Sequence, residues 1–270
     1  MPPCKPGRIH IGTAGWSYPH WIGSFYPQDL RAGAELGWYS RCFGSVEVNN
    51  TFYRLPRPRT VASWREQVPD DFLFSVKASR YLTHVRKLRD AGAGTLRLIE
   101  AISGLGPTLG PLLFQLPPHW KRDAERLNGF LQALPADQRY AIELRDPSWL
   151  HLEILDILRR HRVALCVYDL AGYTTPMITT APFIYVRLHG PGAPYCGSYS
   201  EAALAHWATL IRHWQQQGKD VYCYFDNDEL AYAPHNAAVL SGMLGLQPSF
   251  VPQPTRRRSL SQPAIHHRLR

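Results

Sequence analysis

The feature that most limits the fold of this chain is a series of eight short apolar runs, each about as long as one β-strand. Segments with apolar residues three and four positions apart, the spacing of an amphipathic helix, separate most of the runs. Strands that alternate with helices over about 240 residues predict a single (β/α)₈ TIM barrel, an α/β fold with a parallel sheet. The runs are residues 8–15, 45–53, 72–79, 111–118, 140–146, 163–169, 183–190 and 220–228.

Helical periodicity is visible between most of these runs and once after the last of them. Between the sixth and seventh runs it is absent, so the barrel is expected to be irregular after its sixth strand. A doubly wound open sheet is the competing fold. The strand count disfavours it, and so does the first run, which lacks a Gly-x-Gly-x-x-Gly sequence. The predicted helices are residues 36–42, 60–67, 95–103, 124–133, 150–160, 201–217 and 236–244.

Composition separates the two ends of the chain from its middle. Residues 1–7 are predicted to be a flexible leader, residues 8–246 the barrel domain, and residues 247–270 a disordered tail rich in Pro and Arg. The formal net charge is +9, and five arginines after Pro252, where there are no acidic residues, account for five of these charges. The barrel itself is therefore only mildly basic, so nucleic acid is a candidate partner through the tail more than through the barrel.

Several classes of protein are disfavoured by the sequence. No run approaches the roughly 18 apolar residues that a membrane span needs. The first residues contain no apolar signal-peptide core, which favours a cytoplasmic protein. The 5 cysteines are scattered and include no Cys-x-x-Cys pair, so neither a disulfide framework nor a structural zinc site is expected.

The fifth run shows where a functional site is expected. Polar and apolar residues alternate through residues 140–145, and Asp146 before Pro147 ends the strand. Glu143 and Arg145 therefore share one face near the carboxyl end of a strand. In parallel α/β folds this is the end at which ligands bind.

The same alternation assigns inward-facing residues in the other runs. The more continuously apolar face of each strand should contact the helices, so the opposite face points into the barrel. The sixth run is ambiguous, and Asp169 falls in the first loop position after it. The inward polar and aromatic residues are predicted to be Glu47, Asn49, Ser75, Lys77, Gln115, Glu143, Arg145, Tyr185, Arg187, His189, Tyr222, Tyr224 and Asp226.

These charged residues have two interpretations. Charges are rarely buried unless they are paired or functional, and their position late in the strands favours a site at the barrel mouth. The alternative, less favoured, is an ion-pair network that fills the top of the barrel without any catalytic role.

A set of short motifs, in order along residues 9–244, resembles the YecE-like family, a domain of unknown function (DUF72). The motifs are IGTAGWSY, W-x-G-x-FYP, VEVNNTFYRLP, FSVKAS with LTH, LGPLLFQLPP, AIELRDPSW, VRLHG and YFDND. The resemblance implies a (β/α)₈ barrel related in shape to sugar isomerase-like and endonuclease-like barrels, without an established reaction. The positions it carries over are Trp16, Tyr18, Glu47, Asn49, Thr51, Tyr53, Lys77, His84, Gln115, Glu143, Arg145, Trp149, Asp169, Arg187, His189, Asn227 and Asp228.

One position departs from the family pattern. Asp226 stands in the eighth run, where the family commonly has Asn. The change adds a carboxylate at the barrel mouth and could alter its charge preference.

The preferred hypothesis is an enzyme that acts on a small sugar or sugar phosphate, as a sugar isomerase does. Carboxylates and an imidazole at one mouth could act as acid and base, with or without a divalent ion such as Mg²⁺ or Mn²⁺. The arginines and the lysine could hold an anionic ligand. The predicted catalytic residues are Glu47, Glu143, His189 and Lys77. The predicted substrate-binding residues are Asn49, Tyr53, Gln115, Arg145, Arg187, Asp169, Asn227 and Trp16.

Two alternatives stay open. A metal-dependent phosphoesterase or endonuclease would use the carboxylates to bind metal ions, with Lys77, His84 and the basic tail on a nucleic-acid backbone. A non-catalytic barrel would use the same mouth to bind a ligand or a protein partner.

Overall fold

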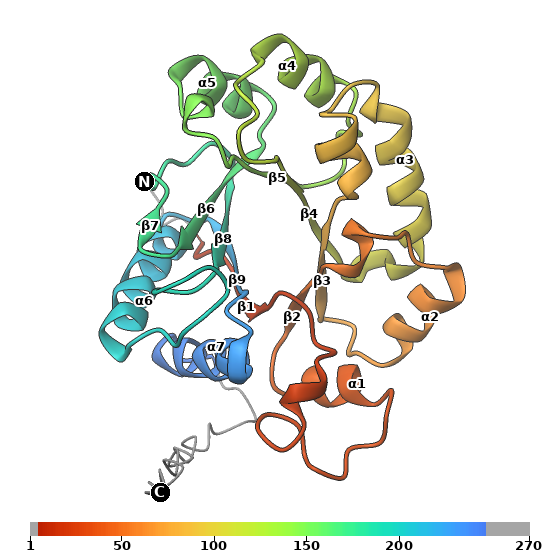
Figure 1. Cartoon of the computed structure of the whole chain (residues 1–270), viewed down its shortest axis with the longest axis vertical. Helices are drawn as coiled ribbons and strands as arrows, with labels where there is room; N and C mark the ends of the chain where they lie inside the picture. The colour runs from red at the N-terminus through yellow and green to blue at the C-terminus, as the bar shows by residue number, and fades with distance from the viewer. Residues whose placement is uncertain (1–4, 247–270) are drawn as a thin grey trace, which may run out of the picture.

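Eight strands run parallel around a nearly closed barrel in residues 5–246, the part of the chain that the computed structural model describes (Figure 1). The predicted TIM-barrel fold is confirmed. Around the barrel the strand order is β1-β9-β8-β6-β5-β4-β3-β2. The strands are β1 (Ile9–Thr13), β2 (Ser45–Val48), β3 (Leu73–Lys77), β4 (Leu109–Gln115), β5 (Tyr140–Glu143), β6 (Ala164–Leu170), β8 (Phe183–Leu188) and β9 (Asp220–Phe225).

A side chain completes the contact between the first and last strands of this order, β1 and β2. Their backbones meet at a single bridge, Ala14 with Glu47. Beside it, the Tyr39 hydroxyl accepts a hydrogen bond from the Thr13 amide (2.9 Å) and donates one to the Ser45 carbonyl (3.1 Å). The phenol therefore satisfies two backbone groups that would otherwise pair directly across the barrel.

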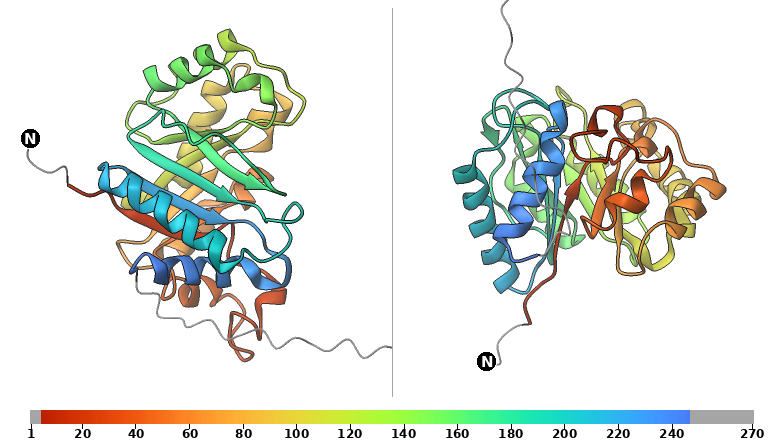
Figure 2. Two further views of the ribbon diagram at one scale, coloured as in Figure 1. Left: turned by 90° about the vertical axis from the view of Figure 1, so that its left-hand side faces the viewer. Right: turned by 90° about the horizontal axis from the view of Figure 1, so that it is seen from below.

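Seven α-helices of the described residues surround the barrel (Figure 1), and Figure 2 shows α6 packed along β8 and β9. Five of the seven begin within two residues of their predicted starts, but α3 and α7 begin four residues early. Gly92 and Gly94 interrupt the apolar pattern of α3, and Pro234 lies in the first turn of α7, where proline is tolerated. The helices are α1 (Glu35–Tyr39), α2 (Pro58–Glu66), α3 (Ala91–Ile102), α4 (Ala124–Gln132), α5 (Leu152–Arg160), α6 (Glu201–Gln216) and α7 (Tyr232–Met243).

Short helical turns follow several strands at the carboxyl end of the barrel. Two of them, η2 after β2 and the π-helical η3 after β3, lie beside the site described below. The turns after strands are η1 (Pro19–Trp21), η2 (Asn50–Phe52), η3 (Tyr81–Val85), η5 (Pro147–Trp149) and η6 (Glu229–Ala231), while η4 (Ser103–Thr108) instead joins α3 to the start of β4.

The sector after β6 is irregular, as predicted. In the described chain no helix separates β6 from β8, and the short strand β7 (Tyr173–Thr174) instead pairs antiparallel with β6. Threonine hydroxyls in this segment bond the β6 backbone. The amide of Leu165 donates to Thr180 (2.8 Å) and that of Tyr168 donates to Thr175 (2.9 Å).

Two apolar clusters confirm the predicted faces of the strands. The larger cluster lies between the strands and the helices and contains Val46, Val76 and Ile142. The smaller one fills the barrel interior with residues of the opposite parity, such as Tyr185 and Tyr224. The charged residues assigned to the interior therefore lie above an apolar floor.

The amino end of the barrel is closed by a second polar group. Arg139 forms an ion pair with Asp220 (2.7 Å) and donates a hydrogen bond to the Tyr222 hydroxyl (2.7 Å). His10 stacks on Tyr222 with ring centroids 4.8 Å apart, and burial lowers the pKa of His10 to about 4. His10 is therefore a neutral part of this plug at neutral pH.

The described residues include no helix that is both long and apolar enough to cross a membrane. A cytoplasmic location stays a prediction. Most of the predicted leader and all of the predicted tail lie outside the described residues. Within residues 5–7, the Gly7 amide donates to the Gln215 carbonyl (2.9 Å) and so attaches the start of the chain to α6.

Candidate functional site at the carboxyl end of the barrel

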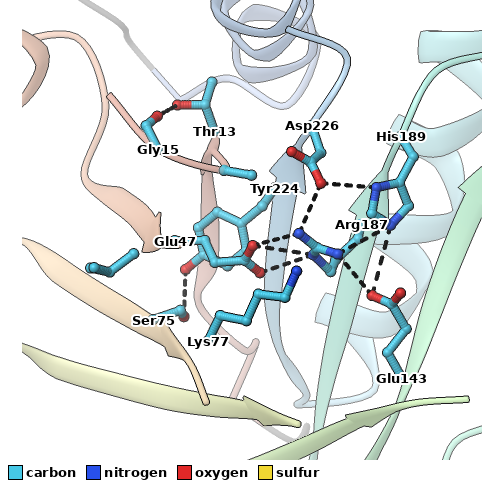
Figure 3. Close-up of polar contacts among 12 residues, drawn as sticks. Thr13, Gly15, Glu47, Ser75, Lys77, Glu143, Arg187, His189, Tyr224 and Asp226 are labelled. Atoms are coloured by element: carbon cyan, nitrogen blue, oxygen red, sulfur yellow. Dashed lines mark hydrogen bonds and ion pairs between the residues drawn. The ribbon is translucent and has the colours of Figure 1, made fainter. Parts of the chain in front are cut away.

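Charged side chains from five strands meet inside the carboxyl end of the barrel (Figure 3). Each comes from the inward parity of its strand and from the last residues before or after the strand end. These residues are far apart in the sequence but lie close together in the structure. The residues are Glu47 from β2, Lys77 from β3, Glu143 from β5, Arg187 and His189 from β8, and Asp226 just after β9.

Arg187 is at the centre of this group and is fully buried. Its Nη2 and Nε donate to the two oxygens of Glu47 (2.7 and 3.0 Å), and Tyr185 donates to the same carboxylate (2.7 Å). Its Nη1 donates to Glu143 Oε2 (3.0 Å), and Nη2 also donates to Asp226 Oδ2 (2.9 Å). One guanidinium thus connects three carboxylates through nearly all of its donors.

A second arginine completes the pairing of Glu143. Arg145 donates through Nε to Glu143 Oε1, and its guanidinium lies 4.5 Å from the centre of the Tyr168 ring. The Arg145 side chain is 9% exposed and that of Glu143 is fully buried. Both oxygens of Glu143 are therefore occupied by arginine.

His189 is oriented by the same two arginines. Arg145 Nη2 lies 2.9 Å and Arg187 Nη1 3.2 Å from His189 Nε2. Because guanidinium groups only donate, Nε2 must accept, and the ring proton is assigned to Nδ1. Nδ1 lies 3.0 Å from Asp226 Oδ2, although not in hydrogen-bond geometry. The basic nitrogen of this neutral tautomer is thus already engaged. We call Glu47, Glu143, Arg145, Arg187, His189 and Asp226 the Arg187 network.

The network keeps its carboxylates ionised. Burial raises the pKa of Glu143, but the Arg145 and Arg187 guanidinium groups outweigh it and hold the pKa well below its usual range. Asp226 shows the same balance: burial raises its pKa, while the nearby cations, Arg187 above all, lower it further than burial raises it. The carboxylate added at position 226 is therefore neutralised within the network.

Lys77 borders the network without joining its ion pairs. Figure 3 shows the amine directed toward Arg187. Within residues 5–246 it has no ion pair within 4 Å, and its nearest aromatic contact is the face of Phe52 (4.5 Å). Burial lowers the pKa of the Lys77 amine and Arg187 lowers it further, while the nearby carboxylates oppose the change without cancelling it. Lys77 is thus a half-buried amine that is easier to deprotonate than a surface lysine.

Two predicted site residues leave a buried acceptor without a partner. Asn49 Oδ1 and Asn227 Oδ1 accept no hydrogen bond from the described residues. The amide nitrogen of Asn227 donates to the Gly197 carbonyl (2.8 Å) and to Asn236 Oδ1 (2.9 Å), so Asn227 fixes the loop before α6. Gln115, next to Glu143 in the β4–β5 register, is half-buried.

Three predicted substrate-binding residues have side chains that contact other parts of the described chain and not the network. Trp16 packs in the outer core, with its ring edge-on to Trp64 (5.4 Å). Tyr53 is 81% exposed, outside the mouth. Asp169 accepts hydrogen bonds from Thr174 (2.7 Å) and from Tyr199 (2.8 Å), which brace the neighbouring loops. Asp169 lies within β6 and not in the loop after it, and its carbonyl accepts a hydrogen bond from the amide of the network residue His189 (2.8 Å). The predicted substrate-binding role of the three residues stays a prediction.

The structure adds two aromatic residues that the sequence did not single out. Tyr195 lies in the loop before α6, has φ +66°, and packs edge-on against His189 (5.4 Å) while 47% exposed. No periodic pattern marks a loop residue of this kind. Tyr168, under Arg145, belongs to the sixth strand, whose alternation is ambiguous in the sequence.

The donor set does not fit a divalent metal. The described residues contain no group of three His, Cys, Asp or Glu side chains placed to hold a metal ion. The Arg187 guanidinium occupies the space between Glu47, Glu143 and Asp226 and already neutralises the oxygens that Mg²⁺ or Mn²⁺ would need. We therefore assign no chemical step to a metal.

Comparison with known proteins gives consistent matches. The family model described as "Protein of unknown function DUF72" matches residues 10–260. The chain is 36% identical over 143 residues to UPF0759 protein YecE of Escherichia coli K12, a match that covers 52% of this chain and about half (50%) of that relative. It is 24% identical over 272 residues to UPF0759 protein YunF of Bacillus subtilis, covering 88% and 95% of the two chains. The crystal structure of a DUF72 family protein from Thermotoga maritima superposes with a TM-score of 0.79 at 28% identity, covering 88% of this chain and 99% of that one.

Proposed function

Because the chain belongs to the DUF72 family, whose description assigns no activity, we propose a function from the site itself: acid–base catalysis on a small hydroxylated carbonyl compound, such as a sugar or sugar phosphate, at the carboxyl end of the barrel. The observation that carries the proposal is the Lys77 amine. It faces the buried network, has no carboxylate partner among the described residues, and has a lowered pKa.

The other ionisable groups of the mouth are already engaged. Glu143 is held by two arginines, Glu47 by Arg187 and Tyr185, and His189 Nε2 by two guanidinium groups. A base must have a free lone pair in reach of the proton that it removes. We therefore assign the Arg187 network a positioning role and Lys77 the proton transfer.

The chemistry that suits this arrangement is movement of a proton between neighbouring carbons. Neutral Lys77 would remove a proton from the carbon next to the carbonyl, leaving the electron pair in an enediolate. The resulting ammonium would return the proton to the former carbonyl carbon, while the hydroxyl proton moves from one oxygen of the enediolate to the other, so that the carbonyl and the hydroxyl exchange places. The ammonium and the adjoining guanidinium groups would stabilise the transient negative charge, and the unpartnered Asn49 Oδ1 would accept a hydrogen bond from a ligand hydroxyl.

Solvent exchange tests this proposal directly. The full-length protein is incubated in D₂O with a panel of aldoses, ketoses and their phosphates, and NMR follows deuterium entry next to the carbonyl. A substrate should show exchange that Lys77→Met lowers by roughly 10²-fold or more. Lys121→Met is the matched control, because its side chain lies at the same end of the barrel but is 78% exposed; it should leave the rate unchanged.

A thermal-shift screen with the same panel separates binding from turnover. A ligand at about 100 times its Kd should raise the Tm of wild type by roughly 5–10 °C for a domain of this size. If Lys77→Met and Glu143→Gln raise stability while every ligand response stays as in wild type, the charges are structural and the proposal fails. Binding without exchange would instead identify a non-catalytic barrel.

A further inference from the structure

The positive charge of the folded chain is concentrated in two neighbouring loops beside the barrel mouth. Residues 49–59, after β2, and residues 78–90, after β3, hold seven arginines and lysines and one acidic residue. Across residues 5–246, basic residues exceed acidic ones by four, so the rest of this range carries two more acidic than basic residues. We call these two loops the arginine surface. Its basic residues are Arg54, Arg57, Arg59, Arg80, Arg86, Lys87 and Arg89.

The charges of the arginine surface are available to a partner. Six of the seven side chains are exposed, and these six form no ion pair within 4 Å with any residue of the described chain. The exception is Arg86, which pairs with Asp90 (2.7 Å). An isolated cluster of this kind repels itself, so a polyanion that binds it relieves the repulsion.

Two exposed aromatic rings accompany the arginines. Tyr53 is 81% and Tyr81 56% exposed, and each lies next to an arginine in the chain, Arg54 and Arg80 respectively. Phe52, one residue before Tyr53, is buried at 9% exposure, whereas Leu55 (37%) and Val85 (61%) are exposed near the two tyrosines. The two loops therefore present rings and a few aliphatic side chains to solvent together with their charges.

Side-chain contacts join the two loops into one surface. The rings of Phe52 and His84 meet edge-on at 5.2 Å, and the Thr51 hydroxyl donates to the carbonyl of Lys77, the residue just before the second loop (2.7 Å). Figure 1 shows the two loops side by side where β2 and β3 lead toward α2 and α3. A partner that binds one of these loops therefore also contacts the other.

We propose that the arginine surface binds single-stranded nucleic acid. Arginine matches phosphate with two parallel hydrogen bonds, and an exposed tyrosine gives an unpaired base a face on which to stack. A membrane surface fits less well, because membrane-binding patches insert Trp, Phe and several Leu, whereas the exposed rings here are phenols and the exposed aliphatic side chains are Leu55 and Val85 alone among the large hydrophobic residues of these loops. This binding does not depend on the reaction proposed for Lys77.

The test is fluorescence anisotropy of the full chain with a labelled 15-nucleotide oligothymidine, over a series of salt concentrations. Arg54→Gln with Arg57→Gln and Arg59→Gln should weaken binding at least tenfold and lower the slope of log K against log salt by roughly 2, at ~0.7 per lost phosphate contact. Tyr53→Ala with Tyr81→Ala should weaken binding with little change in slope. Circular dichroism checks that each variant is folded.

Two matched variants remove the same charge elsewhere. Arg31→Gln with Arg41→Gln and Arg160→Gln changes three exposed arginines outside the arginine surface, and Arg256→Gln with Arg257→Gln and Arg258→Gln changes the basic tail. Both should bind within about threefold of wild type. The proposal is overturned if the tail variant alone loses binding, or if the first control loses as much as the arginine-surface variant. It is also overturned if phosphatidylserine vesicles bind through these residues while the oligonucleotide does not.

Discussion

Replacing Arg187 with methionine should strongly destabilise the protein, because it removes the guanidinium that connects three buried carboxylates. Glu47, Glu143 and Asp226 lie 2.7, 3.0 and 2.9 Å from its nitrogens, and the side chains of Arg187, Glu47 and Glu143 are fully buried. Methionine is similar in length but supplies no donor. Breaking a buried ion pair from one side typically costs 3–5 kcal/mol, since the remaining charge is left uncompensated.

The loss should depend on pH with a defined sign. In wild type the pKa of Glu143 lies well below its unfolded value, so its stabilising contribution is present above pH ~4.3 and is lost as the pH falls through the folded pKa. Without Arg187, the effect of burial on the pKa of Glu143 is less opposed, so this pKa rises. The folded variant then binds a proton at a pH at which the unfolded chain does not. The deficit of the variant should therefore be full near pH 7.5 and shrink toward pH 4.5.

Urea unfolding followed by tryptophan fluorescence measures this deficit. With a slope of about 3 kcal/mol per molar, a loss of ~3–5 kcal/mol lowers the midpoint by roughly 1–1.7 M. Arg159→Met is the control, because its pair with Asp156 has side chains that are 46% and 65% exposed; it should cost less than about 1 kcal/mol. Adding Glu47→Gln and Glu143→Gln to Arg187→Met should recover part of the loss.

A loss below about 1 kcal/mol at pH 7.5, or one that grows on acidification, would refute this reasoning. The first result would mean that the carboxylates are solvated or neutral without the arginine. The second would mean that their folded pKa values are not held down by it.

Three further substitutions test other parts of the structure. Lys77→Met should raise the free energy of unfolding by ~1 kcal/mol at pH 7, and the gain should shrink toward pH 10, because the lowered pKa means that the folded state disfavours the ammonium; a constant gain would contradict this. His10→Phe should remove an acid-induced loss on the order of 2–3 kcal/mol between pH 6.5 and pH 4, seen as a flatter dependence of the urea midpoint on pH than in wild type. Tyr39→Phe should cost about 1–3 kcal/mol and speed hydrogen exchange at the Thr13 amide; unchanged exchange would show that the phenol does not close the barrel.

The sequence predicts the fold and much of the site because both follow from alternation. A strand covered by helices has one apolar face, so the opposite face must point inward. This assigns Glu47, Glu143, Arg187 and His189 to one interior, and the structure confirms that they meet there. The same rule fails for β6, where Cys166 and Tyr168 are masked by apolar residues on both faces.

Other features depend on distances that no local pattern encodes. Alternation cannot say that Arg187, and not a metal ion, lies between the carboxylates, since both arrangements need the same residues on the same faces. The phenol of Tyr39 closes the barrel from a helix, and Tyr195 reaches His189 from a loop. The arginine surface is not evident from composition, because the modest excess of four basic residues in residues 5–246 does not show that the positive charge gathers in two segments.

The proposed function depends most directly on the protonation state of the Lys77 amine. Competitive acetylation of the full-length protein measures this state as a function of pH. Mass spectrometry gives the labelling rate of Lys77 relative to a model lysine peptide in the same tube. We expect Lys77 to react at lower pH than the peptide amine, so that the midpoint of its labelling rate against pH is lower. We also expect a sugar or sugar phosphate that raises the Tm to protect Lys77 from acetylation. A midpoint equal to that of the peptide, with no protection by any such ligand, would contradict the proposal that Lys77 is the reactive group of the mouth.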